Sequence, residues 1–477
     1  MGLTENISKQ TKYLIYLLLA VVLYFVFFHR LSSFYMRTWD ESLYAVNTYE
    51  MLQRNEFIAP YFDGAPDNDK PPMFFWHQMV SIKLFGYNEF GARFPSALYG
   101  ALTVLMLFVF IKKHFGILLS FIIALVLCCA KGFVTFHSAR TGEMDTMIAF
   151  AILGMSISFF NYLETGKLKH LFLYFFFLVF GFYTKILVAL VILPVHALYI
   201  LFKRRDIMKD TRVWLGLLVS FGLIALFLYI RNGYGDQYVQ KHILCLFNRY
   251  GQTPLQDHDQ PFDFYLNNLF NERFVIFAIL IIPAVYLLTK EENRSLKLFL
   301  QLTTLSTVFF LLFISVSVSK LYWYDVPLYP LLAVLAGYVI WRLTMVFSAR
   351  SGSALTFTTL FFIIPVYYAI KRSHNNNITD VEARKCEVIP EYFHDRKNSM
   401  PYDKISVADN NFRSPVLFYK HLFEQYNKEI NITNANLLKA NEVVIAGNDS
   451  IKKYITEHYQ TEQLETYKNA IIFKIKG

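Results

Sequence analysis

Long apolar blocks separated by short charged segments fill residues 1–371 of the chain. A helix needs about 20 apolar residues to cross the hydrocarbon layer of a bilayer. About eleven blocks approach that length, and they predict spans at residues 12–29, 94–111, 117–134, 146–161, 171–183, 186–202, 213–230, 274–289, 297–316, 326–342 and 354–371. The pattern predicts an α-helical polytopic membrane protein.

The fifth and sixth segments could also form one long helix. Lys185 would then lie near the middle of that helix. A lysine at the centre of a bilayer costs about 2.5–3.5 kcal/mol on insertion scales. A chain reversal at Thr184-Lys185 avoids this cost, so we expect two helices joined by a very short turn.

The tail, residues 372–477, is polar and charged, with short apolar segments. These segments are KISVAD, PVLFY, NEVVIAG and NAIIFKI. They predict strands, mixed with amphipathic helical stretches such as 453–466. We therefore expect two domains, a transmembrane domain over 1–371 and a small α/β domain over 372–477.

Charge sets the expected orientation. The net charge is +10, which in a soluble protein would suggest nucleic acid, but hydrophobic residues make up 55% of this chain. Basic residues then belong in cytoplasmic loops, and nucleic acid is not an expected partner. Alternate loops carry the Lys and Arg, which places the N-terminus inside. The first loop, residues 30–93, and the C-terminal domain are therefore expected to be extracytoplasmic.

The first outer loop holds the first candidates for chemistry. It has helix-like stretches at 41–53 and 73–85, joined by a Pro-, Gly- and Asp-rich connection. Asp40 and Glu41 come after the first span and directly follow Trp39. A carboxylate there is a general base, a metal ligand or, more often, a helix cap. The run from Asp67 to Lys70 combines acids with a lysine and could hold a divalent cation and a phosphate together.

Other outer loops contribute further charges, each of which alone is most often an interfacial charge. Together, Asp40, Lys70, Asp145, Lys185 and Lys320 come from four loops that the charge rule places on one face. Converging acids and cations suggest a site for an anionic lipid headgroup. The fourth outer loop, 231–273, adds three further candidates: His242, Arg249 and His258.

At these residues the chain resembles the GT-C glycosyltransferases of the lipid A aminoarabinose transferase and protein O-mannosyltransferase type. The likeness covers about residues 1–345. It is carried by Asp40-Glu41, Tyr44-Ala45, Met51-Leu52, Pro60, Lys70-Pro71-Pro72, Trp76, Phe85-Gly86, Glu89, Ala92-Arg93-Phe94-Pro95, Ala139-Arg140, Asp145, Thr184-Lys185, Ser319-Lys320-Leu321, Tyr324, Pro327 and Pro330.

The resemblance implies roles for these residues. Asp40 would be the catalytic carboxylate, with Glu41 and Asp145 beside it in the catalytic group. The substrate and its phosphate would be bound by Lys70, Lys185, Arg249, Lys320 and Tyr324. A divalent metal (Zn, Mg or Mn) would be held by Asp69 and His242, with His258 as an alternative ligand.

The chain departs from the family pattern at two places. The family usually has Gly after the lysine at position 185, and Ile186 stands there. The family's Glu-His, with an Arg three residues on, is here Lys241-His242 with Cys245. The second departure changes the residues around His242, which the resemblance implies as a metal ligand.

The resemblance implies a GT-C-like enzyme of a bacterial inner membrane. It would move a sugar from a polyprenyl-phosphate carrier to an extracytoplasmic lipid, glycan or protein, by an inverting displacement and surrounded by membrane lipids. A protein O-glycosyltransferase is an alternative within the same fold. A lipid-linked-sugar transporter or flippase, or an inactive scaffold, would be a different class. Transporters carry ionisable residues near the bilayer midplane, whereas the charges here lie in outer loops.

Overall fold

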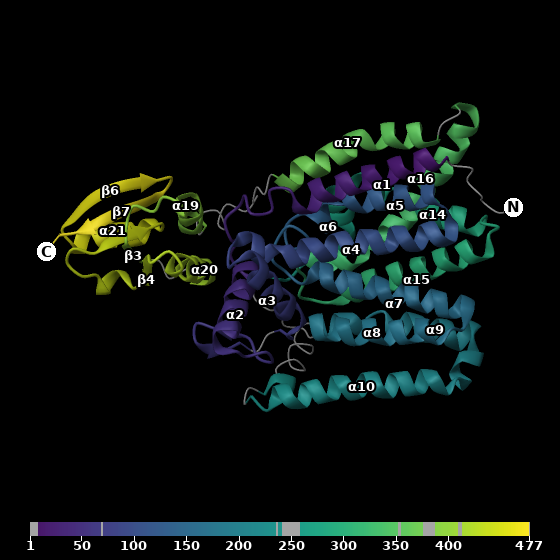
Figure 1. Ribbon diagram of the computed structural model, residues 1–477, viewed down its shortest axis with the longest axis horizontal. Helices are drawn as coiled ribbons and strands as arrows, with labels where there is room; N and C mark the ends of the chain where they lie inside the picture. The colour runs from purple at the N-terminus through teal and green to yellow at the C-terminus, as the bar shows by residue number, and fades with distance from the viewer. Residues whose placement is uncertain are drawn as a thin grey trace.

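The computed structural model describes residues 8–67, 70–234, 237–240, 258–351, 354–374, 387–408 and 413–476. It consists of a long helical bundle and a small α/β domain beyond one end of it (Figure 1). The N-terminus lies at the opposite end of the bundle from the α/β domain (Figure 1). The helices of the bundle end at His374, and the elements of the α/β domain begin at Val388.

Every predicted membrane segment contains helix. In chain order the bundle comprises α1 (Lys9–Leu23), the π-helix η1 (Tyr24–Phe28), α4 (Glu89–Phe115), α5 (Ile117–Cys129), α6 (Lys131–Val134), α7 (Asp145–Thr165), α8 (Leu168–Lys185), the 3-10 helix η2 (Ile186–Leu190), α9 (Leu193–Lys203), η3 (Arg205–Lys209), α10 (Thr211–Asn232), α12 (Phe264–Asn268), η4 (Leu269–Arg273), α13 (Val275–Ala278), α14 (Ile281–Thr289), α15 (Arg294–Val316), η5 (Tyr322–Leu328), α16 (Tyr329–Ser351) and α17 (Ala354–His374).

Eight of these helices among the described residues are long and apolar enough to cross a membrane, which makes the chain a multi-pass membrane protein. A bent pair, Phe264–Arg273 and Val275–Thr289, would make nine if it forms one span. Two of the predicted spans are shorter apolar helices, α5 and α9. All thirteen residues of α5 are buried, so this helix forms the centre of the bundle.

The chain reverses direction at Lys185, as predicted. Lys185 ends α8 beside Asp145, the first residue of α7. The side chain of Arg204 donates a hydrogen bond to the carbonyl of Leu163, near the other end of α7. Residues 186–203 therefore run back along the bundle. The break falls at Ile186, whose φ of 25° interrupts the α-helical hydrogen bonding.

The first loop folds into two helices and a small hairpin. α2 (Asp40–Arg54) and α3 (Met73–Phe85) confirm the predicted helical stretches to within one residue. Between them, β1 (Tyr61–Phe62) pairs with β2 (Ala65–Pro66). This loop lies between the bundle and the α/β domain (Figure 1).

The α/β domain contains a five-stranded mixed sheet in the order β4-β3-β5-β7-β6. Its elements are α19 (Val388–Arg396), β3 (Lys404–Val407), α20 (Arg413–Glu424), β4 (Glu429–Ile432), η6 (Ala435–Leu437), β5 (Val443–Ala446), α21 (Asp449–His458), β6 (Thr461–Tyr467) and β7 (Ala470–Ile475). β3 is parallel to β4 and β5, while β7 is antiparallel to β5 and β6. Three of the four predicted apolar segments form strands of this sheet.

Two predicted elements of the tail were wrong. The segment PVLFY belongs to α20, because the apolar residues continue to Leu422 and Phe423 at helical spacing. The predicted helical stretch 453–466 ends at His458 and continues as β6. The predicted boundary at 372 falls within the last turn of α17, which ends at His374.

The α/β domain and the first loop share one hydrophobic core. The loop and the start of α4 contribute buried residues such as Ala45, Val46 and Tyr87, and the domain contributes residues such as Phe393 and Phe418. The rings of Tyr87 and Phe418 lie 4.8 Å apart. The domain is therefore packed onto the loop that contains the candidate catalytic residues.

Candidate active site

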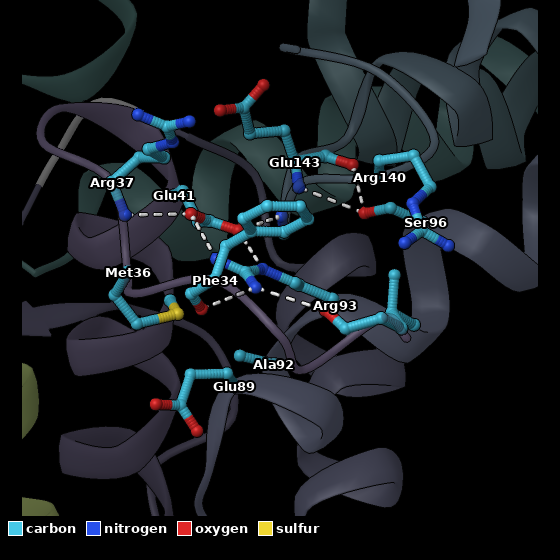
Figure 2. Close-up of polar contacts among 12 residues, drawn as sticks. Phe34, Met36, Arg37, Glu41, Glu89, Ala92, Arg93, Ser96, Arg140 and Glu143 are labelled. Atoms are coloured by element: carbon cyan, nitrogen blue, oxygen red, sulfur yellow. Dashed lines mark hydrogen bonds and ion pairs between the residues drawn. The ribbon is translucent and has the colours of Figure 1, made fainter. Parts of the chain in front are cut away.

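A buried ion pair between Glu41 and Arg93 forms the framework of the site (Figure 2). Glu41 Oε1 lies 2.6 Å from Arg93 Nε, and neither side chain is exposed. The carboxylate also accepts hydrogen bonds from the backbone amides of Arg37, at 2.8 Å, and Gly142, at 2.9 Å. Burial alone would raise the pKa of Glu41, but Arg93 and the two amides offset it and lower the pKa. Glu41 thus joins three outer segments, and its place in the catalytic group stays a prediction.

Arg93 also organises the segment that precedes α2. Its guanidinium donates to the backbone carbonyls of Leu31, Phe34 and Tyr35 at 3.0, 2.9 and 2.7 Å. A buried guanidinium is stable only when its donors are satisfied. Here the carbonyls of the loop satisfy them, so the path of residues 31–35 is tied to α4.

Asp40 is the first residue of α2, where the helix dipole favours a negative charge. The preceding residue, Trp39, has φ 70° and ψ −137°. A bulky side chain at such a backbone conformation costs about 1–3 kcal/mol and persists only when its surroundings hold it. One helical turn after Asp40, Tyr44 hydrogen-bonds to the Asp40 carboxylate. Asp40 is therefore held in a specific geometry at a strained point of the chain.

Three cationic or potentially cationic side chains face Asp40. Burial raises the pKa of Asp40, but Lys70, His137, Lys185 and the hydrogen bond from Tyr44 lower it, and the net pKa is below the ordinary value. Asp40 is therefore ionised at neutral pH. An ionised, partly buried carboxylate beside lysines can accept a proton while the lysines bind an anion.

Asp145, Lys185 and Tyr324 meet at the same place. Lys185 Nζ lies 2.6 Å from Asp145 Oδ1, joining the end of α8 to the start of α7. The same ammonium lies 5.6 Å from the centre of the Tyr324 ring, within cation–π range. The structure thus brings together five of the predicted site residues: Asp40, Lys70, Asp145, Lys185 and Tyr324.

Two further residues in this cluster, His137 and Glu143, were not predicted. His137 Nδ1 lies 2.6 Å from Glu143 Oε2, and both side chains are buried. The imidazole is stacked on Trp323, with ring centres 3.5 Å apart and planes 7° apart. Figure 2 shows the Glu143 carboxylate turned away from Ser96, whose hydroxyl instead binds the Glu143 backbone. Glu143 lies two residues before Asp145, and that spacing was the available signal.

Burial shifts the pKa values of His137 and Glu143 in opposite directions. Burial lowers the pKa of His137 to about 4, despite the nearby Asp40 and Asp145. Burial raises the pKa of Glu143 well above its ordinary value, and the same two carboxylates raise it further. Both shifts favour the uncharged forms of the two groups. The pair adds hydrogen-bonding capacity to the site without adding a third negative charge.

The sequence predicts that Lys320 binds the substrate and its phosphate, and in the structure its ammonium binds a backbone carbonyl. Its Nζ donates to the carbonyl of Gln260 at 2.7 Å, and its backbone amide donates to the carbonyl of His258 at 2.9 Å. Burial lowers the pKa of Lys320, and Asp259 acts in the opposite direction. Lys320 therefore anchors the segment before α12. Its role in phosphate binding stays a prediction.

The expected metal site cannot be built from the described residues. Asp69, His242 and the phosphate-binding candidate Arg249 lie outside them. Within the ranges that the structure describes, no group of three His, Cys, Asp or Glu side chains could hold a metal ion. His258 by itself does not make a site. The divalent metal held by Asp69 and His242 stays a prediction.

Comparisons with known proteins agree with this architecture. The family model described as "Dolichyl-phosphate-mannose-protein mannosyltransferase" matches residues 69–230. An uncharacterized protein of Aquifex aeolicus is 26% identical over 68% of this chain and 63% of its own length. An undecaprenyl phosphate-alpha-4-amino-4-deoxy-L-arabinose arabinosyl transferase of Aeromonas hydrophila is 29% identical over 31% of this chain and 27% of its own length. The chain spans less than two thirds of either relative.

The crystal structure of ArnT from Cupriavidus metallidurans bound to undecaprenyl phosphate superposes with a TM-score of 0.72, at 14% identity, over 98% of both chains. The chain is therefore a multi-pass membrane protein whose fold is similar to that of this structure. In sequence, the chain is similar over part of its length to the mannosyltransferase family model and to the arabinosyl transferase.

Proposed function

We propose that this protein transfers a sugar from a polyprenyl-phosphate carrier to an extracytoplasmic acceptor. The observation that carries the proposal is the ionised Asp40 carboxylate facing Lys70 and Lys185, with Asp145 bound to Lys185. A base beside two cations is what a transfer from a phosphate leaving group requires. The resemblance in fold to a protein bound to undecaprenyl phosphate supports the same donor class.

The lysines would bind the phosphate of the donor. When the bond between sugar and phosphate breaks, the released phosphate gains negative charge. Lys70 and Lys185 would stabilise that charge, and the 2.6 Å contact with Asp145 would hold the Lys185 ammonium in place. Tyr324 would cover the other side of the same ammonium. These contacts would lower the barrier to departure of the carrier phosphate.

Asp40 would act on the acceptor. An acceptor hydroxyl would attack the anomeric carbon of the sugar while Asp40 takes its proton. The lowered pKa of Asp40 keeps the carboxylate ready to accept a proton at neutral pH. A single displacement of this kind inverts the anomeric configuration, so a product that retains the donor's configuration would exclude it.

The acceptor is a lipid, a glycan or a protein on the outer face of a bacterial plasma membrane. The location rests on the position of the basic loops, and on the first loop and the α/β domain lying together at the end of the bundle away from the N-terminus (Figure 1). A divalent metal held by Asp69 and His242 remains part of the proposal.

The test compares cells that carry the wild type, Asp40→Asn and Asp206→Asn. Asp206 is an exposed acid paired with Arg204, outside the cluster, and serves as the matched control. Mass spectrometry of surface lipids, glycans and glycoproteins should reveal one sugar that is missing only from the Asp40→Asn cells. The molecule that loses it identifies the acceptor. If the two variants have the same surface sugars as the wild type, the proposal is wrong.

A further inference from the structure

The first described residue of the α/β domain, Glu387, reaches into the loop that precedes Asp40. Glu387 is 1% exposed. Its Oε2 lies 3.0 Å from Arg37 Nη1 and accepts a hydrogen bond from the Tyr35 hydroxyl at 2.9 Å. Its Oε1 accepts from both the backbone amide and the hydroxyl of Thr38, at 3.2 and 3.1 Å. One buried carboxylate of the domain therefore binds three of the four residues from 35 to 38.

The same segment is held from its other side by the bundle. The backbone amide of Arg37 donates to Glu41, which is paired with Arg93 of α4. Residues 37 and 38 thus lie between two buried carboxylates, Glu41 and Glu387. The next residue, Trp39, has a φ of 70°, and Asp40 follows as the first residue of α2. A backbone conformation of this kind persists only where the surroundings over-determine it.

We propose that Glu387 is a positioning residue through which the α/β domain completes the active site, by holding residues 35–38 so that Asp40 faces its lysines. The proposal rests on the proposed function, in which Asp40 takes the proton of the acceptor. It assigns the domain a direct part in the reaction, although Glu387 itself does not touch the reacting atoms.

A second set of contacts between the α/β domain and the bundle provides a control. It distinguishes the positioning of Asp40 from the docking of the whole domain. Glu89 of α4 binds His394 of α19 at 2.7 Å and Lys397, the residue after α19, at 3.2 Å. These ion pairs join the domain to the bundle. Glu89 is linked to residues 35–38 through Tyr419, whose hydroxyl donates to Glu89 and accepts from the Met36 amide, so removing the His394 side chain leaves that link in place. A change at His394 therefore tests docking, whereas a change at Glu387 tests both docking and the geometry of Asp40.

The experiment uses the full-length chain with Glu387→Ala, Glu387→Gln, His394→Ala and Asp40→Asn. Transfer is measured as the surface sugar that Asp40→Asn cells lack. Ground-state binding is measured with undecaprenyl phosphate on the purified protein. Backbone hydrogen exchange of a peptide covering residues 35–42 reports whether the segment is held, independently of activity.

We expect Glu387→Ala to lower the transfer rate by about 100-fold, as misplacement of a catalytic group by about 1 Å does. Binding of undecaprenyl phosphate should change less than about twofold, and exchange in residues 35–42 should rise about tenfold or more. Glu387→Gln keeps the hydrogen bonds to Thr38 and should recover part of the rate. His394→Ala should match the wild type in transfer and in exchange.

Three results would overturn the inference: a wild-type rate in Glu387→Ala, an equal loss in His394→Ala, or unchanged exchange in residues 35–42. If Glu387→Ala does not fold, Thr38→Val replaces it, because it removes one hydrogen bond to Glu387 at nearly constant volume. Its transfer rate should fall about tenfold, and a wild-type rate would again contradict the inference. If Asp40→Asn cells lose no sugar, the proposed function fails instead, while the exchange data still report on Glu387.

Discussion

Glu41 Oε1 lies 2.6 Å from Arg93 Nε in a fully buried ion pair that ties α2 to α4. The pair lies at the point where the first loop, α4 and the segment before α7 meet, because Glu41 also binds the amides of Arg37 and Gly142 (Figure 2). Asp40 precedes Glu41 in the chain, and Glu143 follows Gly142. Both side chains face the cluster of candidate catalytic residues. Stability and geometry at the site therefore depend on the same contact.

Arg93→Leu should strongly destabilise the protein. It leaves the Glu41 carboxylate buried without its cation, and breaking a buried pair in this way costs about 3–5 kcal/mol. The control is Arg212→Leu, which breaks the exposed pair with Asp210 and should cost about 1 kcal/mol or less. Thermal unfolding of the purified proteins, followed by the loss of the monodisperse fraction, measures the difference. Equal melting temperatures for the two variants would contradict this role of Arg93.

Lys185→Met should weaken the binding of undecaprenyl phosphate. The substitution keeps an unbranched side chain but removes the charge that faces Asp40 and Asp145. Charge-assisted contacts contribute about 1.5–3 kcal/mol, so we expect a loss in affinity of about tenfold or more. Lys203→Met, at the far end of α9, is the matched control and should bind normally. Identical affinities of both variants would exclude Lys185 from the phosphate site.

Glu143→Gln should change how stability depends on pH. The pKa of Glu143 is raised in the folded state, so the folded protein binds more protons than the unfolded chain once the pH exceeds the ordinary pKa of a glutamate. The wild type should therefore lose stability as the pH rises from about 5 to 8, by up to about 1.4 kcal/mol per pH unit from this group.

Gln mimics the protonated carboxyl and removes this dependence. The other charged groups that face Glu143, which are Asp40, Glu41, Asp145 and Lys185, are the same in both proteins. Melting temperatures measured across that pH range should thus converge at low pH and diverge at high pH, with Glu143→Gln the more stable. Parallel curves would show that Glu143 is ionised in the folded protein.

A disulfide should lock the α/β domain to the first loop. The hydroxyl oxygens of Ser42 and Ser414 lie 2.9 Å apart, on α2 and α20. Cysteines at both positions should form a disulfide without a large backbone movement. Mass spectrometry under non-reducing conditions measures the crosslink, and each single cysteine variant is the control. Failure of the double variant to crosslink under oxidising conditions would contradict the observed docking.

Hydropathy along the chain was sufficient to predict which segments of the bundle contain helix. Each predicted segment contains helix, and the two loop helices begin and end within one residue of the prediction. The cost of burying Lys185 also located the chain reversal correctly. These features follow from local rules, because a span, an amphipathic stretch or a turn is decided by residues that are close together in sequence.

The local rules were insufficient where a short pattern fits two structures. PVLFY is a short continuous apolar run that fits a strand or a helix, and it packs as part of α20 because the first loop covers its apolar face. The sequence indicated Asp40, Lys70, Asp145 and Lys185 by residue type and by the side of the membrane. It did not indicate His137, which is identified as a residue of the site by its contacts with Glu143 and Trp323.

What the sequence by itself determined was the membrane-spanning character, the elements of the first loop and most of the charged residues of the site. Only the tertiary structure decided that Glu41 belongs to Arg93, that Lys320 binds Gln260, and that Glu387 holds the residues before Asp40. Glu387 and Arg37 are 350 positions apart in the chain. Partners this remote are chosen by the packing of whole elements and by the cost of burying a charge without a partner, which a local pattern does not record.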